Sequence, residues 1–68
     1  MTSMTSHDAD LRTVARAYIE QREAGALDHA AFVAAVGAYR ERHPEATKGE
    51  AASIVNNLMQ EIPRAGYR

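Results

Sequence analysis

Two short breaks divide this chain into three segments with helical periodicity, and none of the segments alternates as a strand does. Gly25 follows the first segment and Pro44 the second. Glycine ends helices by adopting positive φ, and proline excludes the preceding residue from helical geometry. Short links make consecutive helices neighbours in space. We therefore predict an all-α fold, a compact three-helix domain with helices at about 8–24, 28–42 and 48–62.

The first segment carries one apolar stripe at helical spacing, formed by Leu11, Val14, Ala15, Tyr18 and Ile19. Asp8 is the expected N-cap, because its carboxylate can accept hydrogen bonds from the unpaired N–H groups of the first turn. Residues 1–7 open on a Met-Thr-Ser repeat, and we expect them to be disordered. The single domain then spans residues 8–62, and residues 63–68 form a short C-terminal tail that begins with Pro63.

Capping signals also mark the starts of the second and third helices. Asp28 is the expected N-cap of the second helix, and Leu27 and Phe32 occupy the positions of a hydrophobic staple. Thr47 and Glu50 have the spacing of a capping box at the start of the third helix. The second helix has an apolar stripe made by Phe32, Ala35, Val36 and Tyr39. The third has the clearest stripe, made by Ala51, Ile54, Val55, Leu58, Met59 and Ile62.

The chain is short and rich in alanine. Its 68 residues, with a mass of 7.4 kDa, have room for one domain and for no deep pocket of its own. Alanine accounts for 14 residues, and small residues crowd the middle helix: Ala30, Ala31, Ala34, Ala35, Gly37 and Ala38. The middle helix either lies between the other two or meets a second copy of the chain through one small-residue face. Gly37 costs about 1 kcal/mol relative to alanine inside a helix, so we expect a close helix contact there.

Composition excludes several classes of protein. The absence of cysteine excludes a disulfide-stapled scaffold and a thiolate metal site. Eight basic and nine acidic residues give a net charge of −1, which argues against strong general attraction to nucleic acid or anionic membranes. No apolar run approaches the ~20 residues of a membrane helix, and the N-terminus lacks the pattern of a signal peptide. We therefore expect a cytoplasmic protein, and many arginines beside a single lysine suggest a bacterial source.

Motifs of known enzyme classes are missing from the sequence, including phosphate-binding glycine loops, HExxH and GxSxG. His7, His29 and His43 lie near the ends of different segments, and their spacing matches no set of metal ligands. A catalytic site would require an oligomer, and no residue stands out for it. We predict a protein that is not an enzyme and that uses no cofactor or metal.

The leading hypothesis is a small protein-interaction module (a regulator, adaptor or accessory subunit) that acts through a helical face. Its partner would be another protein or a second copy of itself. Apolar residues at the edges of the stripes, and residue types that anchor interfaces, are the candidate contacts. These candidates are Arg16, Ile19, Val33, Tyr39, Arg40 and Met59.

The alternative is a DNA-binding regulator of helix-turn-helix type that uses the third helix. Basic residues cluster around the second break, and the third helix carries Asn and Gln side chains, which can pair with adenine in the major groove. The candidate residues are Arg40, Arg42, Lys48, Ser53, Asn56, Asn57 and Gln60. Because the third helix holds Lys48 together with Glu50 and Glu61, we favour a solvated polar face over nucleic-acid contact.

Residues 28–62 resemble the opening helical hairpin of the HU/IHF family of nucleoid proteins. The run DHAAFVAAV at 28–36 is similar to that family's first helix, and TKGEAASIVNNL at 47–58 is similar to its second. In that family DNA-binding β-arms follow the hairpin, whereas six residues follow Ile62 here. The first helix also has no counterpart in the family's core. We interpret the resemblance as a shared capping and amphipathic pattern and carry over no functional residue.

Overall fold

A computed structural model of the chain describes residues 3–65, with side chains described for residues 7–62. Three helices follow in order, α1 (Ser3–Glu23), α2 (Asp28–Arg42) and α3 (Lys48–Ala65), and the described residues include no strand. The predicted all-α three-helix fold is therefore confirmed.

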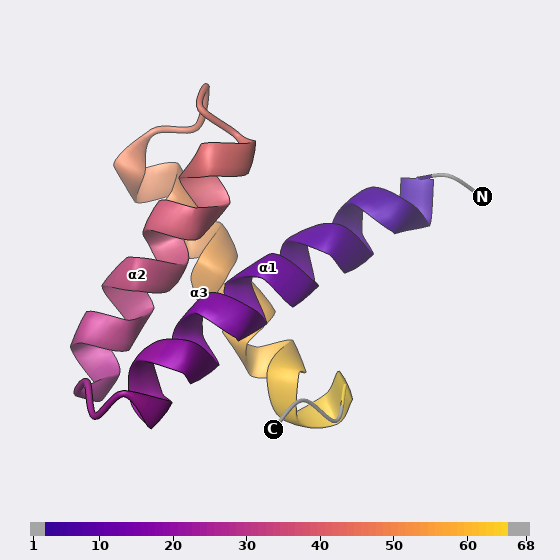
Figure 1. The fold of residues 1–68 in the computed structure, drawn as a ribbon. Coiled ribbons are helices and arrows are strands. Elements are labelled where there is room, and N and C mark those ends of the chain that lie inside the picture. Colours follow the sequence, from indigo (N-terminus) through magenta and orange to yellow (C-terminus); the bar gives the residue numbers. More distant parts are fainter. Residues whose placement is uncertain (1–2, 66–68) are drawn as a thin grey trace.

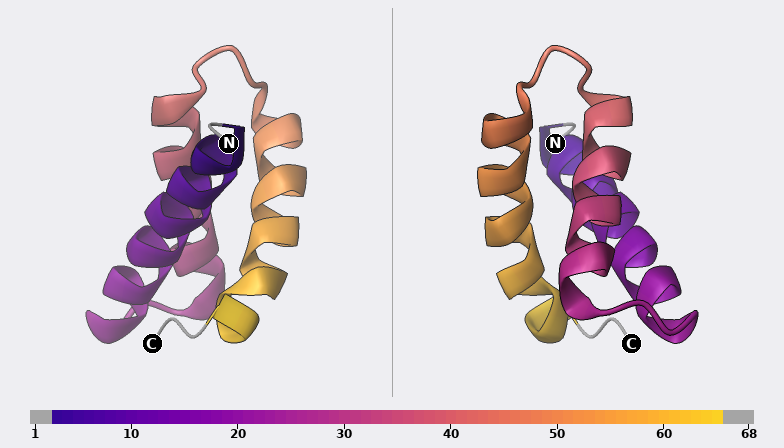
Figure 2. Two further views of the ribbon diagram at one scale, coloured as in Figure 1. Left: turned by 90° about the vertical axis from the view of Figure 1, so that its right-hand side faces the viewer. Right: turned by 90° about the vertical axis from the view of Figure 1, so that its left-hand side faces the viewer.

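The three helices pack in two layers. Helices α2 and α3 run antiparallel as a hairpin, and α1 crosses one side of this hairpin obliquely (Figure 1). Figure 2 shows the same hairpin from two further directions, with α1 in front of it in one view and behind it in the other. Each helix contacts the other two. The radius of gyration, 11.4 Å, is close to the ~11 Å expected for a compact chain of this length.

Two helix ends differ from the sequence prediction. Helix α1 begins at Ser3, so residues 3–7 are helical rather than disordered, and Asp8 lies inside the helix instead of capping it. No glycine or proline precedes Gly25, so nothing in the sequence interrupts this helix early. Helix α3 continues through Pro63, because the φ of proline suits a helix and its missing N–H affects one backbone bond near the end. The remaining terminal residues, 1–2 and 66–68, lie outside the described range.

Three predicted signals at the helix ends are confirmed. Gly25 has a φ of 98°, the left-handed conformation that glycine adopts without steric cost. The N–H of Glu50 donates to Thr47 Oγ1 at 3.1 Å, and the N–H of Thr47 donates to Glu50 Oε1 at 3.0 Å, so the capping box is formed. Helix α2 ends before Pro44, and His43 leaves helical geometry with φ −132° and ψ 70°.

The prediction for the start of α2 is wrong. The N-cap is Leu27, which makes no side-chain capping bond, and Asp28 is the first residue of the helix. The Asp28 carboxylate instead accepts a hydrogen bond from the Tyr18 hydroxyl, which ties the end of α1 to the start of α2 and raises the pKa of Tyr18. Leu27 is 77% exposed and lies outside the core that Phe32 packs against, so no staple forms.

The core is small and draws on all three helices. Val14 of α1 and Val55 of α3 are fully buried. Four alanines with no exposed surface bring the backbones close together: Ala15, Ala31, Ala35 and Ala51. Ile54, predicted on the apolar stripe of α3, is 38% exposed. Helix α3 contacts α1 and α2 less extensively than those two contact each other, so its buried arc is narrow and Ile54 falls at the edge of that arc.

Replacing Leu58 by Ala is expected to lower the free energy of unfolding by about 2–5 kcal/mol, because the buried side chain leaves a cavity. Ile54→Ala is the matched control on the same helix and should cost about 1 kcal/mol or less, because its side chain is already partly solvated. Urea unfolding followed by circular dichroism measures both. Equal losses would contradict the edge position of Ile54.

Candidate functional site

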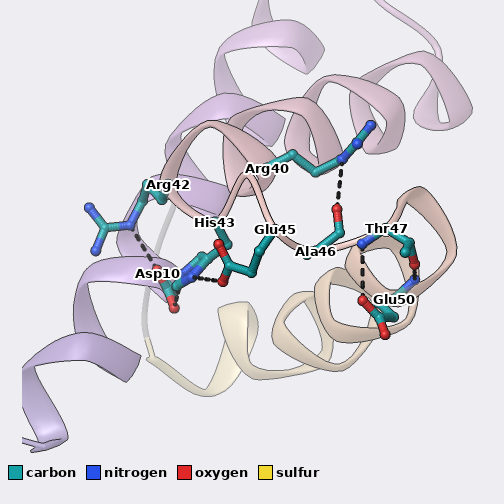
Figure 3. Close-up of polar contacts among 8 residues, drawn as sticks. All are labelled: Asp10, Arg40, Arg42, His43, Glu45, Ala46, Thr47 and Glu50. Atoms are coloured by element: carbon teal, nitrogen blue, oxygen red, sulfur yellow. Dashed lines mark hydrogen bonds and ion pairs between the residues drawn. The ribbon is translucent and has the colours of Figure 1, made fainter.

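The carboxylate of Asp10 joins α1 to the C-terminal end of α2. Arg42 Nε donates a hydrogen bond to its Oδ1 at 2.8 Å, and His43 Nε2 lies 3.0 Å from both carboxylate oxygens (Figure 3). The Asp10 side chain is 13% exposed, so these contacts are partly shielded from solvent. The His43 ring stacks on Tyr39 with ring centroids 4.5 Å apart, and its Nδ1 lies 3.8 Å from Glu45 Oε2. Together these contacts hold the end of α2 against α1.

The environment of this cluster keeps Asp10 ionised. Burial alone would raise the pKa of Asp10, but hydrogen bonds and electrostatic attraction from Arg42 and His43 hold it below its ordinary value of 3.8. Burial, together with the carboxylates of Asp10 and Glu45, raises the pKa of the Tyr39 hydroxyl. Both oxygens of Asp10 are already engaged as acceptors, so this cluster joins helices and does not present a free general base.

The sequence prediction did not select Asp10, although one signal for it was present. Asp10 lies one turn before Val14 and next to Leu11, so a carboxylate falls on the apolar side of α1. A charge in that position needs a partner from a neighbouring helix. The identity of that partner depends on how α1 crosses the hairpin, which the local sequence does not specify.

Three of the predicted partner contacts lie at or in the core. Tyr39 is 7% exposed and is stacked against His43, so it offers little surface to a partner. Ile19 and Met59 are partly buried and pack against the core cluster. All three side chains belong to apolar stripes that neighbouring helices cover, so their residue types alone did not separate core from surface.

The other three predicted partner contacts differ in exposure. Arg16 is exposed on α1, and Val33 is exposed on α2. Arg40 is half-buried, and its Nε donates to the backbone carbonyl of Ala46 at 3.3 Å (Figure 3). Arg40 therefore supports the loop between α2 and α3, whereas Arg16 and Val33 remain available to a partner.

The predicted polar face of α3 is present, but its basic neighbours are engaged. Four exposed side chains share the side opposite the buried residues of α3: Ser53, Asn56, Asn57 and Gln60. Lys48 is exposed at the start of the same helix. Arg42 pairs with Asp10, and Arg40 bonds the loop. The antiparallel course of α2 and α3 also differs from the 90–120° crossing of a helix-turn-helix pair (Figure 2).

An open depression lies on the outer side of α1 where it meets α2. We call it the α1–α2 depression, with a volume of about 310 Å³. Its lining residues are Ala9, Arg12, Thr13, Arg16, Ala17, Glu20 and Ala38. Ala38 is the one residue of this lining that α2 contributes, so the depression adjoins that helix.

The neighbouring solvent side of α2 is apolar. Ala30, Val33, Ala34 and Gly37 follow the i, i+3, i+4, i+7 spacing of a single helix face. We call these four residues the outer face of α2; Ala34 is half-buried and the others are exposed. A Cβ built at Gly37 would meet nothing within 4 Å, so the close contact predicted there is not made by the part of the chain that the structure describes. The reason is that α1 and α3 cover only the opposite side of α2.

No protein-family model, no curated protein and no solved structure matches this chain. Within residues 3–65, no helix has the length and apolar character needed to cross a membrane. Among the described side chains, no group of three or more His, Asp or Glu residues is placed to hold a metal ion.

Asp10→Asn is expected to lower the free energy of unfolding by about 1–3 kcal/mol near neutral pH, because the amide lacks the charge that Arg42 and His43 contact. Asp8→Asn is the matched control on α1. Its carboxylate is exposed and lies 3.8 Å from Arg12, so its loss should cost about 0–1 kcal/mol.

The stability advantage of the unmodified chain over Asp10→Asn should depend on pH. The folded-state pKa of Asp10 is lowered, so the advantage is fully present above the ordinary value of 3.8 and is lost as the pH falls through the folded value. Urea unfolding over a series of acidic pH values measures it. An advantage that persists undiminished at the most acidic pH would contradict the assignment of this ion pair.

Proposed function

We propose that this protein is a small interaction module, a regulator, adaptor or accessory subunit, that docks a partner on one helical surface. The docking surface comprises the α1–α2 depression and the outer face of α2. The supporting observation is that α2 presents apolar residues in both directions. Ala35 and Val36 are buried in the core, while Val33 and Gly37 face solvent. A helix that is apolar all round is normally covered on all sides.

The contrast with α3 supports the same surface. Helix α3 has a buried apolar side and a polar outer side with Asn56, Asn57 and Gln60, which is the ordinary pattern of a surface helix. Helix α2 lacks such a polar outer side between Ala30 and Gly37, and its exposed polar residues lie at its two ends. A partner helix can also approach the backbone of α2 closely, because the outer face consists of three small residues and Val33.

A docking interface would take up a substantial share of this small chain. A standard interface buries roughly 800 Å² on each partner, which is about a sixth of the 4683 Å² accessible surface of this chain. The arginines that line the depression, Arg12 and Arg16, are of the residue type that is enriched at interfaces.

DNA binding is the second candidate, since Ser53, Asn56, Asn57 and Gln60 share one exposed face. It has less support, because Arg42 is paired with Asp10 and the net charge is −1. A salt titration with mixed-sequence duplex DNA tests it. Absence of binding at low salt removes this candidate, because even non-specific DNA-binding proteins bind there.

Gly37→Arg separates docking from folding. Because the site is open and arginine forms helices better than glycine, the free energy of unfolding should rise by up to ~1 kcal/mol. The bulky charged side chain should block close approach to the outer face of α2, so affinity for a partner that co-purifies from the native host should fall at least about tenfold.

Asn57→Arg is the matched control on the exposed face of α3 and should leave that affinity unchanged. Titration calorimetry of the purified pair measures both variants. The proposed function is contradicted if the chain is monomeric and no stoichiometric partner accompanies it, or if Gly37→Arg retains full affinity for its partner.

A further inference from the structure

The exposed side of α1 carries charges in a definite order. Along the helix Arg12 and Arg16 come first and Glu20 and Glu23 follow, with the two members of each pair one turn apart. All four side chains are exposed, and three of them line the α1–α2 depression. Within the depression the stripe is therefore basic toward Arg12 and acidic toward Glu20, and Asp8, one turn before Arg12, lies 3.8 Å from it.

The described ion pairs within the chain leave the centre of this stripe unused. On α1 they involve His7 with Glu61, Asp8 with Arg12 and Asp10 with Arg42. Arg16 and Glu20 take no part in those pairs. The depression is also lined by small side chains, Thr13 and Ala17, that keep its floor low enough for another helix to approach.

This charge order is complementary to itself when the helix is reversed. We propose that the partner at the docking surface is a second copy of this chain, whose α1 lies antiparallel across the α1–α2 depression about a twofold axis. Arg16 of each copy then faces Glu20 of the other, and Arg12 faces Glu23. An isologous interface has this property, since each contact occurs twice with the roles exchanged.

The charge pattern favours a second copy over a partner of uniform charge. A uniformly acidic helix would meet Glu20 and Glu23, and a uniformly basic helix would meet Arg12 and Arg16. A parallel arrangement of two copies would place arginine opposite arginine, whereas the antiparallel one pairs opposite charges and also opposes the two helix dipoles. The ion pairs between the two copies of α1 select the antiparallel orientation. The outer face of α2 adjoins the depression through Ala38, so its burial in the dimer adds apolar area to the interface.

Charge reversal and charge exchange test this inference, which rests on the docking surface of the proposed function. Sedimentation equilibrium of the unmodified chain should show a dimer at micromolar to millimolar concentrations. Arg16→Glu and Glu20→Arg should each raise the dimer Kd by about tenfold or more, because like charges then face each other. An equimolar mixture of these two variants should form a heterodimer, and the double variant Arg16→Glu/Glu20→Arg should recover the homodimer.

Lys48→Glu is the control, because it reverses an exposed charge on α3 outside the docking surface and should leave the dimer Kd unchanged. Thermal unfolding of every variant checks that the fold is retained. A monomeric unmodified chain, or a dimer whose Kd is unchanged by the single reversals Arg16→Glu and Glu20→Arg, overturns this inference. If the unmodified chain is monomeric but binds another protein, and Gly37→Arg weakens that binding, only the inference of a second copy is overturned. If the chain is monomeric and binds no partner, the proposed function is contradicted as well.

Discussion

The partly buried carboxylate of Asp10 fastens α1 to the C-terminal end of α2. It accepts hydrogen bonds from the last turn of α2 and from the residue that follows, so one side of α1 is held toward the hairpin. Leu11 and Val14 lie on that side and are buried in the core. The opposite side, with Arg12 and Arg16, is directed to solvent. This polar contact and the apolar packing of α1 therefore keep the lining of the α1–α2 depression on the outside of the molecule.

The alanine-rich composition has two structural consequences rather than one. Ala31 and Ala35 of α2 have no exposed surface and allow the helices to approach closely. Ala30 and Gly37 lie on the other side of the same helix and are exposed. Close packing therefore accounts for only some of the small residues of α2. The exposed ones motivate a docking function, because an apolar helix face in water is costly unless something covers it.

Local signals predicted most of the fold. The capping box at Thr47, the left-handed conformation at Gly25 and the break at Pro44 all depend on residues within a few positions of one another. Such interactions form whatever the rest of the chain does, so they can be recognised without a structure. The N-cap predicted at Asp8 was wrong because its helix continues upstream, and the one at Asp28 was wrong because Tyr18 binds that carboxylate.

The sequence by itself determined that this chain forms three amphipathic helices with short links, because helical periodicity and helix-ending residues act locally. Only the tertiary structure decided which edge residues are covered: Tyr39 is buried, while Ile54 and Val33 are exposed. It also decided that Asp10 meets Arg42 and His43 across more than thirty residues of chain. These outcomes depend on the angle at which α1 crosses the hairpin, and that angle is set by packing between helices rather than by any one segment.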